Sequence, residues 1–406
     1  MQRFVSIALI VVGLGLAMLG LLAGLFYLGL PVVSPDARYD LLQINTVAMA
    51  VLAVSGGAGS VLAWVGWRRY SGAASSAAHL PSPWWLVLLF LLALAVGEAV
   101  LQTNVAPWLF PPVHVIASMA APLFLLARAA SLLRPSGLVV QRRDVALQVA
   151  GGAVLATGLA IVIEVILVAL LALAAALIVA LTPGGSARLE TLVAQLSRPE
   201  VLSDPAFLQS LLSSPLVLIG AGLVIALGAP LIEEFSKSVG VVLIAAGRAR
   251  LTPGEAFLWG VAAGAGFAIT ETMFNVVTVL PAWGGPLMLR SATAVVHCLA
   301  AGLMGLAWQA WLSGERRWRL PALYGLAVVI HGLWNGVAGL ASVLQAQGTL
   351  NANLLVGAGG TLLVFALAGL FVINSGLFVY IGRRLGQPPV MALAPLPVES
   401  TVTPEV

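Results

Sequence analysis

This sequence carries little charge: Asp, Glu, Lys and Arg make up only 8% of its 406 residues, whereas 61% are hydrophobic. A soluble protein has about 25% charged residues, and the mean hydropathy here is +1.06. This composition excludes a soluble enzyme, a disordered protein and a fibrous protein. It leaves a polytopic membrane protein.

Cysteine and lysine are almost absent. The single cysteine, Cys298, excludes an intrachain disulfide and a cysteine-based metal site. The single lysine is Lys237, and the other basic residues are 18 arginines, grouped in pairs and triples between apolar runs. Because no helix has a basic face, the net charge of +4 does not indicate nucleic-acid binding, and we expect no nucleic-acid partner.

Long apolar runs dominate what is present. A spanning helix needs about 20 apolar residues, and ten runs meet this length. They lie at residues 4–30, 41–67, 84–105, 112–133, 146–181, 212–246, 255–280, 288–313, 320–342 and 353–382. We predict an all-α polytopic membrane protein with about ten transmembrane helices.

The longest connection divides these runs into two sets of five. We expect a five-helix membrane region at 1–181, an extracytoplasmic loop at 182–211 and a five-helix domain at 212–384. A disordered cytoplasmic tail should follow at 385–406, where prolines are frequent.

Arginine also predicts the orientation. If the N-terminus is inside and the segments alternate, 14 arginines fall in inner segments and 4 in outer ones. The outer ones are Arg38, Arg188, Arg198 and Arg290. By the positive-inside rule, the chain crosses the cell membrane with both termini in the cytoplasm.

Ionisable residues inside spans indicate where chemistry could occur, because each costs about 2.5–3.5 kcal/mol at a helix centre. In the N-terminal half Glu98, Glu164 and His114 stand alone. We interpret them as residues that form interhelical hydrogen bonds or lie at the membrane interface. Four successive C-terminal spans differ, since each carries at least one ionisable group, and in three of them the candidate residues recur at helical spacing. They are Glu233, Glu234 and Lys237 in the sixth span, Phe267, Glu271 and Asn275 in the seventh, His297 in the eighth, and His331, Trp334 and Asn335 in the ninth.

The depths of these groups coincide. Counted from the nearest inner charges, Glu233, Glu271, His297 and His331 lie roughly 18–28 Å above the inner anchors. Such groups must face one another or a wet cavity. Glu233 and Lys237 lie four residues apart and can pair, and Pro230 should kink the helix one turn earlier.

This inventory suits water-dependent acyl hydrolysis. Two adjacent carboxylates in low dielectric cannot both ionise easily, so the pair can act as a general acid and base. We predict that Glu233 activates water and that Glu234 either tunes the charge of Glu233 or helps to place the water. The amide of Asn335 and a histidine N–H should stabilise an oxyanion. His297 is expected to hold the attacking water together with Glu233.

The same residues carry a family resemblance. Glu-Glu-x-x-Lys at 233–237, Phe-x-x-x-Glu at 267–271, a lone His at 297 and His-x-x-x-Asn at 331–335 resemble the PrsW family of intramembrane proteases. That family is similar to the CAAX prenyl protease group. The resemblance covers residues 212–343 and implies an endopeptidase acting on membrane-embedded protein substrates in the lipid bilayer. Thr272 departs from the Glu-Asn pair expected there, which leaves the role of Asn275 open.

Other interpretations remain at this point. A proton-coupled transporter also uses midplane Glu and His, and the charges could merely pair in a scaffold or in an inactive protease homologue. A compact polar layer without internal repeats favours the hydrolase.

A catalytic zinc could be held by His297, His331 and Glu271. We favour a metal-free mechanism, because Asn335, one turn from His331, suits oxyanion binding and is a poor zinc ligand.

Overall fold

The computed structural model describes residues 2–33, 41–198, 200–201, 204–245, 251–314, 316–350 and 353–388. Arg38, Arg248 and Arg250, which enter the orientation argument, and most of the predicted tail lie outside the described residues. Every named element in the described ranges is a helix. The helices are α1 (Gln2–Val33), α2 (Leu41–Val51), η1 (Leu52–Ala58), α3 (Gly59–Tyr70), α4 (Pro83–Thr103), η2 (Pro107–Leu109), α5 (Phe110–Leu133), η3 (Arg134–Ser136), α6 (Arg142–Ala150), η4 (Gly151–Ala156), α7 (Thr157–Ala180), α8 (Gly185–Leu196), α9 (Pro205–Leu212), α10 (Pro215–Leu223), η6 (Val224–Gly228), α11 (Ala229–Ala245), α12 (Pro253–Val276), η7 (Val277–Ala282), α13 (Gly284–Leu312), α14 (Arg319–Leu350) and α15 (Leu354–Leu385).

Ten helical stretches in the described chain are long and apolar enough to cross a membrane. They are Arg3–Phe26, Leu41–Tyr70, Pro83–Thr103, Pro107–Ser136, Arg142–Ala180, Pro215–Val242, Pro253–Ala282, Gly284–Leu312, Arg319–Thr349 and Leu354–Leu385. Each coincides with one of the predicted runs. The prediction of an all-α polytopic membrane protein is therefore confirmed.

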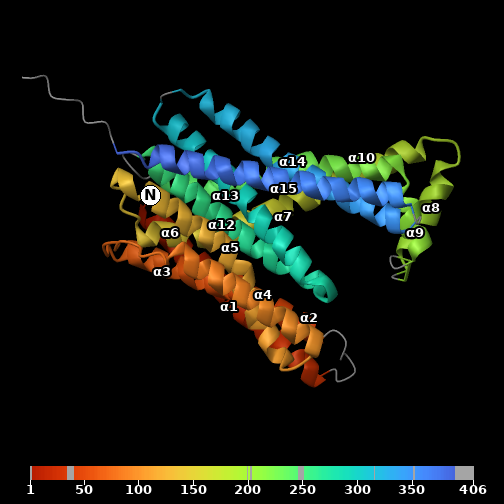
Figure 1. Cartoon of the computed structure of the whole chain (residues 1–406), viewed down its shortest axis with the longest axis horizontal. Coiled ribbons are helices and arrows are strands. Elements are labelled where there is room, and N and C mark those ends of the chain that lie inside the picture. Colours follow the sequence, from red (N-terminus) through yellow and green to blue (C-terminus); the bar gives the residue numbers. More distant parts are fainter. Residues whose placement is uncertain are drawn as a thin grey trace, which may run out of the picture.

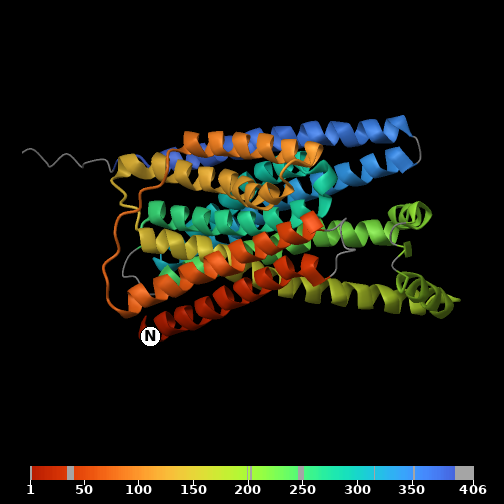
Figure 2. The ribbon, with the colours of Figure 1, turned by 90° about the horizontal axis from the view of Figure 1, so that it is seen from below.

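The spanning helices lie roughly side by side along the long axis of the molecule (Figures 1 and 2). The start of α1 and the end of α15 lie at the same end of this bundle, as an even number of crossings requires. The connection predicted at 182–211 contains two short helices, α8 and α9, which project at the opposite end.

Helices α12 and α13 form the centre of the bundle and are mostly buried. Their contact is close because small residues line it: a Cβ at Gly264 would lie only 2.4 Å from the carbonyl oxygen of His297. In lipid, helices associate largely through such close packing. The short glycine contact therefore fixes the backbone that carries His297 against α12.

The sixth span is not a uniform α-helix. Pro230 has no N–H to donate to the carbonyl of Ala226, four residues earlier, and a π-helical turn, η6, precedes α11 here. Gly332 of α14 approaches this turn so closely that a Cβ would lie 2.3 Å from Ala226 O. The predicted irregularity at Pro230 therefore lets α14 approach the sixth span beside the polar layer.

Candidate active site

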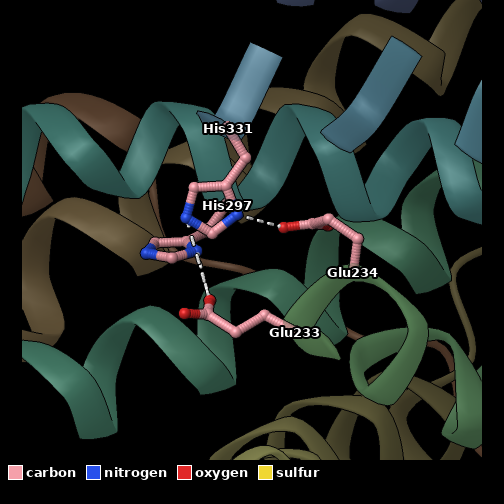
Figure 3. Close-up of side chains that lie close together, drawn as sticks. All are labelled: Glu233, Glu234, His297 and His331. Atoms are coloured by element: carbon pink, nitrogen blue, oxygen red, sulfur yellow. Dashed lines mark hydrogen bonds and ion pairs between the residues drawn. The ribbon is translucent and has the colours of Figure 1, made fainter. Parts of the chain in front are cut away.

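Glu233, Glu234, His297 and His331 converge from α11, α13 and α14 (Figure 3). One ligand-capable atom of each residue lies within 4.8 Å of those of the other three, and all four side chains are buried. The four residues, which the sequence placed on three separate spans, thus form one cluster. This arrangement agrees with the common depth inferred from the residue counts.

Lys237 occupies the middle of this cluster. Its Nζ donates to Glu233 Oε2 at 3.0 Å and to Glu234 Oε1 at 2.7 Å, and it lies 2.8 Å from Nδ1 of His297. The ring of Phe267 closes one further side, with its centroid 4.2 Å from Nζ. The side chain of Lys237 is fully buried, so these groups replace water as the solvation shell of its ammonium.

Each histidine faces a carboxylate on a different helix. Nδ1 of His331 lies 2.7 Å from Glu234 Oε1, and its Nε2 lies 3.8 Å from Glu233 Oε2. His297 places Nε2 2.8 Å from Glu271 Oε2. Because an ammonium can only donate, Nδ1 of His297 must accept from Lys237, which assigns the ring proton to Nε2 facing Glu271.

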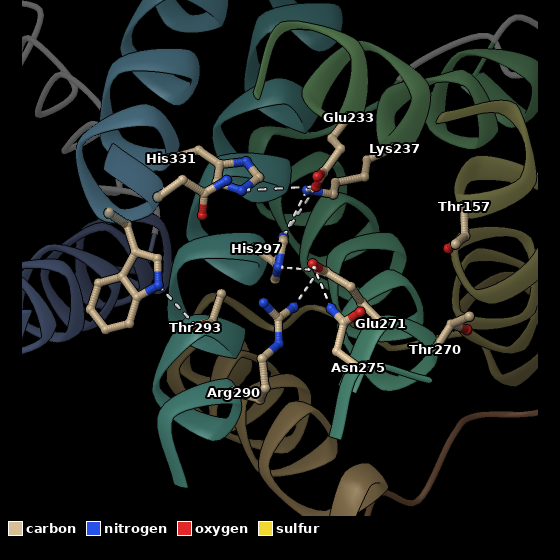
Figure 4. A network of polar contacts seen from close by, with 12 residues as sticks. Thr157, Glu233, Lys237, Thr270, Glu271, Asn275, Arg290, Thr293, His297 and His331 are labelled. Atoms are coloured by element: carbon tan, nitrogen blue, oxygen red, sulfur yellow. Dashed lines mark hydrogen bonds and ion pairs between the residues drawn. The ribbon is translucent and has the colours of Figure 1, made fainter. Parts of the chain in front are cut away.

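A second layer holds Glu271 in place (Figure 4). Arg290 forms an ion pair with Glu271 Oε2, and the amide of Asn275 donates to Glu271 Oε1 at 3.4 Å. Asn275, whose role the departure at Thr272 left open, therefore contacts the site through Glu271. In Figure 4, these side chains connect α12 and α13 below the cluster.

A cavity of about 420 Å³ lies beside the cluster and reaches only one of the two adjacent glutamates. Glu233 lines it, with its side chain 8% exposed, whereas the side chain of Glu234 is fully buried. Asn335 and Trp334 of α14 line the same cavity. Asn335 donates one hydrogen bond to Ile225 O of the π-helical turn, at 3.3 Å, and Trp334 donates to Thr293 Oγ1 at 2.9 Å.

Two residues that line this cavity, Glu164 and Arg290, were not predicted from the sequence to belong to the site. Glu164 of α7 was interpreted as a solitary structural residue, yet it lines the cavity with Glu233 and Glu271. Arg290 was counted as a charge of an outer segment, but it lies on α13 in contact with Glu271 and also lines the cavity. A signal for Arg290 was available: it precedes His297 by seven residues and so shares its helix face.

The contacts also describe the surroundings of His114 and of the predicted zinc ligands. His114 is structural, since Nε2 lies 2.9 Å from Met273 O and Nδ1 accepts from Trp283 at 2.9 Å. The zinc ligand set of His297, His331 and Glu271 remains a prediction; in the structure Glu271 faces Nε2 of His297, and Lys237 faces its Nδ1. Among the described residues, the group that could share one ion is Glu233, Glu234, His297 and His331.

The comparisons with known proteins give one match. A family model described as PrsW family intramembrane metalloprotease matches residues 141–369. No curated protein and no solved structure matches. The match is longer than the resemblance carried by the motifs and takes in α7, which brings Glu164 to the cavity. It covers more than half of the chain and all four helices of the polar layer, and the chain therefore belongs to the PrsW family of intramembrane proteases.

Proposed function

We propose that this membrane protease hydrolyses peptide bonds of membrane-embedded protein substrates in the cavity beside Glu233, and that Glu233 is its water-activating base. One observation carries this assignment: of the two adjacent glutamates, only Glu233 lines the cavity. A general base must be within reach of the water from which it takes a proton. Glu234, which is enclosed and lies beside His331, serves to orient that ring.

Water is held between Glu233 and His331 in this proposal. The proton on Nδ1 of His331 faces Glu234, so Nε2 can accept from a water that also contacts Glu233. His297 has both ring nitrogens against Lys237 and Glu271. The water-holding role that the sequence suggested for His297 therefore passes to His331, and His297 fixes Lys237 instead.

The chemical step follows general acid–base hydrolysis. Glu233 takes a proton from water, the resulting hydroxide attacks the scissile carbonyl carbon, and the carbonyl oxygen becomes an oxyanion. The amide of Asn335 and the guanidinium of Arg290 border the cavity and supply donors for this oxyanion. Glu233 then returns its proton to the departing nitrogen as the C–N bond breaks.

The description of the family model includes the word metalloprotease, so we ask whether the residues of the cluster can bind a metal ion. Two imidazoles and two carboxylates are donors that zinc accepts. However, Lys237 Nζ already lies 2.7–3.0 Å from Glu233 Oε2, Glu234 Oε1 and His297 Nδ1. Zinc bonded at about 2.0–2.2 Å to the same atoms would need the volume of this ammonium. With Lys237 in this position the residues do not fit a metal, and the proposed step uses side chains alone.

The experiment is a comparison of membrane-protein fragments in cells that express the wild-type chain or Glu233→Gln at equal levels. We expect new termini within or beside spanning helices only with the wild type, because loss of a catalytic base costs about 10² to 10⁴-fold in rate. Glu98→Gln is the matched control, since Glu98 also lies in a span but contacts Gln102 rather than the cluster. Fragments that persist in Glu233→Gln, or a wild type that makes none, would contradict the proposal.

A further inference from the structure

The cluster contains a cation site with an unusual occupant. Glu233 Oε2, Nδ1 of His297 and Nε2 of His331 face one another, and each histidine nitrogen lies 3.8 Å from that oxygen. The far nitrogen of each ring faces a carboxylate, Glu271 for His297 and Glu234 for His331. Glu234 also belongs to the four-residue group that could hold an ion, and its Oε1 contacts Lys237. Carboxylates on the far nitrogens orient histidines in metal sites and increase their basicity.

The group found among these atoms is the ammonium of Lys237. It contacts two of the four ligand-capable residues as a donor to carboxylate oxygens and a third, His297, at a ring nitrogen. The aromatic face of Phe267 covers it from a further side. These are the partners a cation needs when it has no water.

We propose that Lys237 is a built-in cation that occupies the metal position of a two-histidine, two-carboxylate site, and that it keeps divalent metals out of this chain. The ammonium and a metal ion compete for the same volume and the same oxygen and nitrogen atoms. The charges in direct contact agree with this proposal: Lys237 and Arg290 carry two positive charges against the three carboxylates of Glu233, Glu234 and Glu271. Replacing the single charge of Lys237 by Zn²⁺ would balance these three carboxylates.

This inference rests on the metal-free arrangement proposed above, but its test does not require cleavage. The wild-type chain, Lys237→Met and Lys237→Met/His331→Ala are purified in detergent, treated with a chelator and incubated with zinc alone. Unbound metal is removed, and zinc per chain and the thermal unfolding midpoint are measured. Methionine keeps most of the apolar stem of lysine but lacks the terminal ammonium, so it removes the competing charge and frees the volume that Nζ occupies.

We expect less than about 0.1 zinc per wild-type chain and about one per chain in Lys237→Met. Zinc should raise the unfolding midpoint of Lys237→Met, because a ligand that binds only the folded state stabilises it. It should leave that of the wild type unchanged. The double variant, which lacks a ligand, should lose both effects.

Each alternative outcome is decisive. If the wild type binds stoichiometric zinc that His331→Ala removes, Lys237 does not exclude metal and the proposal is wrong. If neither the wild type nor Lys237→Met binds zinc, the cluster is not a latent metal site. Should Lys237→Met fail to fold without metal, zinc in the growth medium should rescue it, and failure of this rescue also contradicts the proposal. Cleavage by Glu233 is measured separately, so either proposal can fail while the other stands.

Discussion

At the scale of single residues, Arg290 is the clearest example of a side chain whose role depends on its neighbours. It neutralises Glu271, which in turn faces the proton-bearing nitrogen of His297. Arg290→Met removes this counter-charge and a proposed oxyanion donor, so it should lower the cleavage rate about 10²- to 10³-fold, the range measured when one oxyanion donor is lost. Arg290→Lys, which keeps the charge, should retain more activity. A wild-type rate in Arg290→Met would show that the ion pair does not support the site.

The same ion pair makes a prediction for stability. Removing Arg290 leaves Glu271 enclosed in the membrane without its main counter-charge. Both side chains are partly exposed to the cavity, 17% and 24%, so we expect a loss of about 1–3 kcal/mol, less than the 3–5 kcal/mol of a fully buried pair. Arg290→Met/Glu271→Gln should unfold at a higher temperature than Arg290→Met alone, because the uncompensated charge is gone. Thermal unfolding in detergent measures this, and simple additivity of the two changes would argue against the pairing.

Trp334 supports the site through one hydrogen bond between α13 and α14. Its indole N–H donates to Thr293 Oγ1 at 2.9 Å, and the ring is buried. Trp334→Phe should cost about 1–2 kcal/mol in unfolding free energy, since it leaves a buried hydroxyl without this donor and removes aromatic volume. Thr293→Val should cost less when added to Trp334→Phe than it does alone. Equal costs in both backgrounds would mean that the bond does not couple the helices.

At the scale of elements, the approach of α14 to the sixth span depends on Gly332. A Cβ there would lie 2.3 Å from Ala226 O, and the atom it meets is backbone, which cannot rotate away. Gly332→Ala should push α14 away from η6, move His331 away from Glu234, and cost about 1–3 kcal/mol, as overpacking does. Cleavage should fall together with stability. The measurement is the cleavage rate and the unfolding midpoint of the detergent-purified variant.

Gly325→Ala provides the control for this substitution. Gly325 lies on the same helix, two turns earlier, and a Cβ there meets no atom within 4 Å. The control should stay within about 0.5 kcal/mol of the wild type and keep its activity. If both alanine variants behave alike, the close contact at Gly332 does not determine the geometry of the site.

The elements also show what the sequence could reveal. The ten spans follow from hydropathy, because an apolar run of sufficient length has few alternatives to a spanning helix. The convergence of Glu233, Glu271, His297 and His331 could be inferred from depth and helical spacing alone. The hydrogen bond from Asn275 to Glu271 could not be inferred from the sequence, because a bond of this kind depends on side-chain rotamers.

Contacts between distant segments were the part that the sequence did not reveal. Glu164 stands alone in its own span, and only the packing of α7 brings it to the cavity. Arg290 lies near the start of the apolar run 288–313, where hydropathy cannot separate a loop charge from a buried partner. The position of Lys237 between three ligand atoms likewise depends on how α11 and α13 face one another.

At the scale of the whole molecule, the N-terminal half contributes to the site through packing. The hydroxyl of Thr270 donates to Ala153 O in η4 at 2.8 Å, and the segment that contains Thr157 lies beside it (Figure 4). This contact fixes α12, which carries Glu271, against the fifth span. The family match begins just before that span, at residue 141, in agreement with its place in the wall of the cavity.

The orientation of the molecule remains a prediction from the arginine distribution. Both described ends lie at one end of the bundle, so they share a side of the membrane. Because inner segments carry most of the arginines, that side should be the cytoplasm. A reporter fused after Arg384 should therefore read as cytoplasmic, and Ser197→Cys, beyond α8 at the opposite end, should react with a membrane-impermeant thiol reagent from outside.

The chain supplies its own controls for this experiment. Cys298 is fully buried, so the unmodified protein should give little background labelling. Ser71→Cys lies at the end of α3, next to Arg68 and Arg69, and should react only after the membrane is made permeable. If Ser71→Cys is labelled from outside and Ser197→Cys is protected, the orientation of the protein in the membrane is the reverse of the predicted one. By residue count along their helices, Arg290 and Asn335 lie between Glu233 and the end of the bundle that carries α8. The cavity should therefore lie nearer the outer leaflet in the predicted orientation and nearer the inner leaflet in the reversed one.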